Sequence, residues 1–213
     1  MKNKKLEIIC IYKSKFGDEF DFPHPIGCIE DDEIANFEGI TGGFFVTLNG
    51  YEVIFRKADF DTLLQAISFL LDSLYWLKES PPAERKTVED DLLTLVLETM
   101  SGEKLVLTKV EDGKLTLSFL AANKEQEDRR GYYYCSDILI DTKDWKEATN
   151  KALEEYFTLA QKVISINEGQ SSRTLNECID LWEKVRFKRE KVRLKRSSLL
   201  NSICQLFHKW KLN

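Results

Sequence analysis

The chain has 213 residues, 43% hydrophobic and 31% charged, which is enough apolar material for a sizeable core and excludes a globally disordered protein. No apolar run approaches the roughly 20 residues of a membrane-spanning helix, and the basic start lacks the apolar stretch of a signal peptide. The five cysteines are dispersed and form no C-x-x-C pair, so we expect reduced thiols in a cytoplasmic protein.

The net charge of −5 is unevenly distributed. Residues 184–213 contain ten lysines and arginines and one acid, a net charge of +9, which leaves −14 on residues 1–183. An acidic body with a basic tail predicts either a charged partner or a tail that folds back on the body.

The first part of the chain reads as strands. Leu6–Lys13 is a continuous apolar run with β-branched residues, which predicts a buried strand. Phe44–Leu48 and Tyr51–Arg56 flank Asn49-Gly50, a strong hairpin signal because both turn positions need a positive φ.

A helix is predicted from Asp59, a suitable N-cap, to Leu77. Its polar stripe is narrow, so we expect neighbours to cover most of its sides. Trp76 continues that stripe and is interpreted either as a core residue or as an exposed contact for a partner. Ser80-Pro81-Pro82 ends the helix, because proline cannot continue it, and marks a boundary.

The second part repeats this order. A second helix, half exposed, is predicted from about Asp144 to Gly169. Two segments of the first part match the second at one offset of 85 residues, which predicts an internal repeat. The predicted strands are Asp91–Glu98, Lys104–Val110, Lys114–Leu120 and Tyr132–Ile140.

These elements predict an α+β fold, with mostly antiparallel sheet in two similar strand-rich halves, each closed by a helix, and a C-terminal helical arm. The predicted divisions are a first half over residues 1–80, a second half over residues 81–168 and a basic arm over residues 169–213.

The arm allows two interpretations. Apolar residues from Leu175 to Trp210 recur at alternating spacings of three and four, with Arg189 and Arg196 at two core-type positions, as in a coiled-coil seam of a homodimer. Alternatively, two amphipathic helices break near Ser197-Ser198, and the first, Leu175–Val185, packs on the body. The basic residues that could contact a partner are Lys184, Arg186, Lys188, Arg189, Arg193 and Arg196.

One short motif carries a resemblance to an enzyme family. Asp141-Thr142-Lys143 follows an apolar strand and resembles the (D/E)-x-K half of metal-dependent restriction-type nucleases. The resemblance implies that Asp141 holds Mg²⁺ while Lys143 supports the attacking water. The second acid that this family needs would be Asp112, whose Asp-Gly sequence is also typical of a turn.

Other catalytic patterns are missing from the sequence, which has two histidines and no Gly-rich phosphate loop, and no cofactor is expected. The sequence therefore favours a non-enzymatic cytoplasmic protein that binds another protein, for instance an inhibitor or immunity-type protein for a basic partner. The alternatives are the metal-dependent nuclease and an oligomeric scaffold held by residues 175–210. Nucleic acid is a less favoured partner because the body would repel a polyanion.

Overall fold

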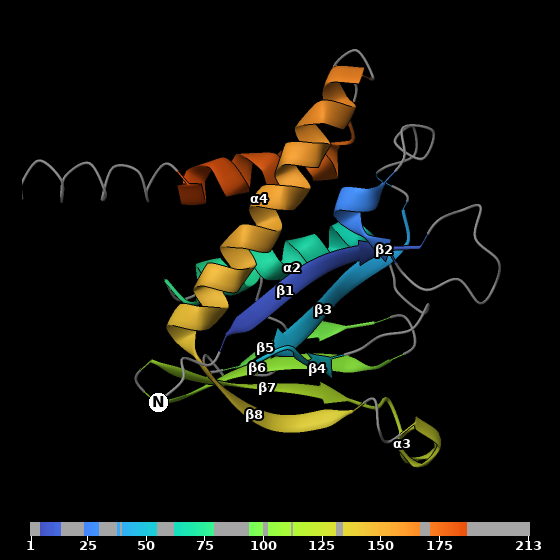
Figure 1. Cartoon of the computed structure of the whole chain (residues 1–213), viewed down its shortest axis with the longest axis vertical. Helices are drawn as coiled ribbons and strands as arrows, with labels where there is room; N and C mark the ends of the chain where they lie inside the picture. The colour runs from blue at the N-terminus through green and yellow to red at the C-terminus, as the bar shows by residue number, and fades with distance from the viewer. Residues whose placement is uncertain are drawn as a thin grey trace, which may run out of the picture.

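The computed structural model is an α+β fold with two antiparallel sheets, which confirms the predicted fold class (Figure 1). The described residues are 5–13, 24–29, 38, 40–54, 62–78, 94–99, 102–111, 113–130, 134–166 and 171–186.

The first sheet has the strand order β2-β1-β3-β4. The predicted hairpin between β3 and β4 is confirmed, since Asn49 and Gly50 have φ values of 58° and 80°. β1 and β3 approach each other closely at Gly42. A Cβ on this residue would lie 2.5 Å from the carbonyl oxygen of Ile11, so there is no room for a side chain. The elements of this part are β1 (Leu6–Tyr12), β2 (His24–Pro25), the 3₁₀ turn η1 (Ile26–Cys28), β3 (Gly42–Leu48) and β4 (Tyr51–Ile54).

The second sheet has the order β5-β6-β7-β8 and is a simple antiparallel meander. Gly102 and Gly113 have φ values of 81° and 77° in its tight turns, where a side chain would be strained. The elements are β5 (Thr94–Glu98), β6 (Lys104–Glu111), β7 (Lys114–Leu120), the short helix α3 (Lys124–Arg130) and β8 (Cys135–Asp141).

The helix α2 (Leu63–Trp76) lies between the two sheets, and it packs against β3 on one side and β5 on the other (Figure 1). Nine of its fourteen residues are buried, so the expected cover on most sides is confirmed. The helix begins later than predicted. Thr62 occupies the N-cap position, so the prediction of Asp59 as the N-cap is wrong. Asp59 itself lies outside the described residues.

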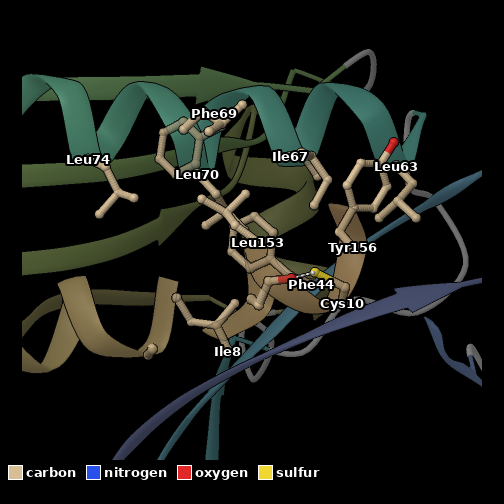
Figure 2. Packing of buried hydrophobic residues seen from close by; sticks show 14 of the residues in the cluster. Ile8, Cys10, Phe44, Leu63, Ile67, Phe69, Leu70, Leu74, Leu153 and Tyr156 are labelled. Carbon is tan, nitrogen blue, oxygen red and sulfur yellow. Dashed lines mark hydrogen bonds between the residues drawn. The ribbon is translucent and has the colours of Figure 1, made fainter. Parts of the chain in front are cut away.

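The long helix α4 (Thr142–Ile166) follows β8 directly, and the predicted start at Asp144 is therefore two residues late. Although α4 follows the second sheet in the sequence, it packs mainly against β1 of the first sheet and against α2. Figure 2 shows Leu153 and Tyr156 of α4 facing Ile67 and Leu70 of α2. Both sheets and both helices therefore share one buried apolar cluster.

One polar contact ties α4 to α2 inside this core. The buried indole N–H of Trp145 donates to Ser73 Oγ at 3.0 Å, and Ser73 Oγ donates to the carbonyl oxygen of Leu70 at 2.7 Å. The indole N–H and the serine hydroxyl are thus both satisfied, as burial requires.

The helical segment over residues 173–186 packs on the body. Its N-terminus is capped by Ser172 Oγ, which accepts from the amide of Leu175 at 3.1 Å. Trp182 stacks on Phe157 of α4 with a ring separation of 5.6 Å. The buried side chains of this segment are Leu175, Cys178, Trp182 and Val185.

Candidate protein-interaction surface

Trp76 is not on the surface. Only 3% of the residue is exposed, so the interpretation as an exposed partner contact is wrong and the core interpretation holds. Trp76 ends α2 and faces β6, where Lys109 Nζ lies 4.3 Å from the ring centroid and donates to the carbonyl oxygen of Trp76 at 3.0 Å. Burial, followed by the charge of Lys146, lowers the pKa of Lys109.

Two of the six basic residues that were predicted to contact a partner lie in the described start of the basic arm. Lys184 and Arg186 are exposed on the outer side of the helical segment. Its inner side packs within the chain, so the first four positions of the proposed coiled-coil seam are already occupied. The other predicted contacts lie outside the described residues, and they are Lys188, Arg189, Arg193 and Arg196.

The two described residues of the nuclease-like motif, Asp141 and Lys143, each pair with a residue outside the motif. Asp141 Oδ1 lies 2.6 Å from Lys114 Nζ, whereas Lys143 is in the first turn of α4 with its Nζ 3.9 Å from Glu147 Oε1. Asp112 lies outside the described residues. Among the residues that the structure describes, no three His, Cys, Asp or Glu side chains are grouped to hold a metal ion.

The strongest candidate surface is the outer face of the second sheet, opposite α2. Along each strand, alternate side chains point to the two faces of a sheet. Leu105, Leu107, Leu115 and Leu117 are nearly or fully buried on the inner face, so their neighbours in β6 and β7 point outward. The cross-strand pairing then fixes which outward residues are adjacent.

Two adjacent rows of residues across this outer face are uncharged, and the exposed Asp137 of β8 lies beside the end of the second row, next to Ser118. One row pairs Thr94 with Thr108, Thr108 with Thr116, and Thr116 with Leu139. The next row pairs Val96 with Val106 and Val106 with Ser118. Leu139 is 48% exposed and Val96 37% exposed, although solvated sheet faces usually carry polar side chains. We call these two rows the central rows.

Charges frame the central rows at both ends of the sheet. At one end, Glu98 lies opposite Lys104 in the register. At the other end, Lys114 and Asp141 form the ion pair described above. Each positive side chain thus has a negative neighbour, and the frame has little net field of its own.

The β8 edge of this sheet is distorted. Asp137 has a φ of 55°, and its amide donates to Ser118 Oγ at 2.9 Å instead of to the strand ladder. The pairing register between β7 and β8 shifts at the same place. A bulge of this kind blunts an edge against the addition of another strand.

This surface was not predicted from the sequence. A signal was present in Ile138-Leu139-Ile140, because an antiparallel strand with one solvated face needs apolar residues only at alternate positions. The middle residue of the run, Leu139, is the most exposed apolar side chain of the central rows.

The chain matches no protein-family model, no curated protein and no solved structure in the comparisons. Within the described residues, no helix has both the length and the apolar character needed to cross a membrane.

Proposed function

We propose that this chain is a non-enzymatic cytoplasmic protein that binds another protein through the outer face of its second sheet. The observation that supports this proposal is the uncharged character of the central rows, with Val96 and Leu139 exposed in a sheet whose ends are charged. Protein interfaces have the same anatomy, since their centres are depleted in charge and their rims are polar.

The charge of the chain supports a basic partner. Residues 1–183 carry −14, and charge complementarity accelerates association over a distance before the apolar contact forms. An inhibitor or immunity-type protein for a basic target would use both features. The net charge would steer the encounter, and the uncharged rows would stabilise the complex.

The test compares Leu139→Asp with the unchanged chain in affinity capture from the source organism, read by quantitative mass spectrometry. A charge in the centre of an interface should cost at least about 2 kcal/mol, or roughly a thirtyfold loss of affinity. The partner should therefore be lost with Leu139→Asp. It should be retained with Gln161→Asp, because Gln161 is an exposed residue of α4, which packs mainly against β1 and α2.

Two controls make the result decisive. Thermal unfolding of both variants must match that of the unchanged chain, since both substitutions replace exposed residues. Capture at increasing salt separates the electrostatic from the apolar contribution to partner binding. Steering by the net charge weakens as the ionic strength rises, whereas the apolar contact does not weaken. Equal capture by all three proteins would refute a role for this face.

A further inference from the structure

The edge strands in the described part of the chain differ in how well they could accept a further strand. β2 has two residues, and β4 has four and pairs with β3 through a register shift. β8 pairs with β7 through another register shift. All five residues of β5, in contrast, pair with β6 in one continuous register, and none of them is a proline or a lysine. Short strands, bulges, prolines and lysines are the devices that protect natural sheet edges, and β5 has none beyond its modest length.

The hydrogen bonding of the β5–β6 hairpin shows which backbone groups of β5 point outward. The amide of Thr99 donates to the carbonyl oxygen of Glu103 at 2.9 Å, so the backbone of Thr99 faces β6. In an antiparallel pair, every second residue of a strand bonds to the same neighbour. The amides and carbonyl oxygens of Thr94, Val96 and Glu98 therefore point away from β6, to a side where no described strand pairs with them.

The sequence of β5, T-L-V-L-E, reads almost the same in both directions about Val96. Two copies paired antiparallel at this residue would place Val96 of each copy opposite Val96 of the other, and Leu95 opposite Leu97 of the second copy. The backbone supports this register, because the amide and carbonyl oxygen of Val96 are among those that point outward. A two-fold contact requires such self-complementarity, since the same residues serve both copies. A second copy brings the matching pattern with it, whereas an unrelated strand would have to supply its own.

The side chains on the outer face also suit a second copy. Val106 and Val96 of one copy would continue directly into Val96 and Val106 of the other, so an apolar row would run unbroken across the contact. Glu98 would lie opposite Thr94 of the second copy, so no like charges would oppose each other. The edge therefore fits a second copy without a buried or opposed charge.

We propose that two copies of this chain associate through β5, by antiparallel pairing centred on Val96, and so join their four-stranded sheets into one continuous sheet. This inference goes beyond the proposed function, because it concerns the edge of the second sheet and not the binding of another protein to its outer face. It gives a role to Val96, which is 37% exposed in the single chain and lies at the centre of the contact in the dimer. A contact through one short strand is small, so the dimer should be reversible.

The experiment measures the mass of the full chain by sedimentation equilibrium, from about 5 µM to about 500 µM, a range that suits small protein interfaces. We expect the mass to rise with concentration from 24.8 kDa toward twice that value. A mass of 24.8 kDa at every concentration would overturn the inference.

Two lysine variants locate the contact. Val96→Lys would place two like charges opposite each other at the two-fold axis and should raise the dissociation constant of the dimer at least about tenfold. Val110→Lys is the matched control, because Val110 is 54% exposed on β6, which is not an edge strand. It should change the dissociation constant by less than about twofold. Equal dimerisation of Val96→Lys and the unchanged chain would overturn pairing through β5 and would favour another contact, such as the basic arm.

A mixture of variants separates a direct contact from a folding defect. Val96→Glu opposes like charges in the same way as Val96→Lys, but an equimolar mixture of the two pairs opposite charges across the axis. We expect the mixture to recover a dimer that neither variant forms alone, which a misfolded variant could not do. No association of the mixture, with both variants folded by circular dichroism, would overturn the pairing centred on Val96. The Val96→Lys chain, which is monomeric by this inference, is also the background in which the concentration dependence of unfolding reports on the arm.

Discussion

The helical segment over residues 173–186 provides the sharpest test of how the arm is used. Trp182 is 7% exposed and stacks on Phe157, so Trp182→Ala removes one of the largest buried side chains at this contact. A tryptophan buries on the order of 150–250 Å², and its replacement by alanine in a core costs about 3–5 kcal/mol. We expect about 3 kcal/mol, the low end, because Trp182 retains some exposure.

The measurement is urea unfolding followed by circular dichroism at two protein concentrations. Glu183→Ala is the matched control, since Glu183 is exposed beside Trp182 and its replacement should change the stability by less than about 0.5 kcal/mol. If the segment packs within one chain, the unfolding midpoint in the Val96→Lys background is independent of concentration. A loss below about 1 kcal/mol for Trp182→Ala would refute the packing of Trp182 on the body. A midpoint that rises with protein concentration would favour the coiled-coil dimer.

Three further predictions concern the core. Burial raises the pKa of Cys10 from its ordinary 9.0 to about 12, so iodoacetamide at pH 8 should label exposed Cys28 at least about a hundredfold faster than Cys10, as peptide mass mapping would show. The sign of the shift means that the contribution of this thiol to stability is complete below pH 9.0 and is lost as the pH rises toward 12. Ser73→Ala leaves the buried indole N–H of Trp145 unpaired and should cost about 1–3 kcal/mol in urea unfolding. Gly42→Ala places a Cβ 2.5 Å from a backbone oxygen of β1 and should cost at least about 1–3 kcal/mol in the same assay, whereas no loss would contradict the close approach.

Local features of the sequence predicted the local structure well. The β3–β4 hairpin follows from Asn49-Gly50, because the required backbone angles select those residue types. The burial of α2 by neighbouring elements follows from its composition, because a helix that is apolar on most sides is not stable when those sides face water. The packing of residues 173–186 follows from four buried residues at spacings of three and four.

Long-range pairing was not predictable in the same way. The offset of 85 residues matched β1 with β5, yet β1 lies inside its sheet between β2 and β3, whereas β5 lies at the edge of its sheet beside β6. The connections before the helices also differ, since α4 starts at once after β8 and α2 starts at Leu63, well after Ile54. A pattern of apolar residues identifies a face that must be buried but does not specify the element that buries it.

The packing of α4 shows why the candidate surface lies where it does. α4 packs mainly against β1 and α2 and contacts the second sheet at β8, whereas α2 packs against β3 of the first sheet and β5 of the second. The inner leucines of β6 and β7 are buried by this arrangement, whereas Val96 and Leu139 of the outer rows remain exposed. A sheet face that only had to stay solvated would gain solubility from lysine or glutamate at Val106, Thr108 and Thr116. The absence of charge at these central positions is the feature of this fold on which the proposed binding face rests.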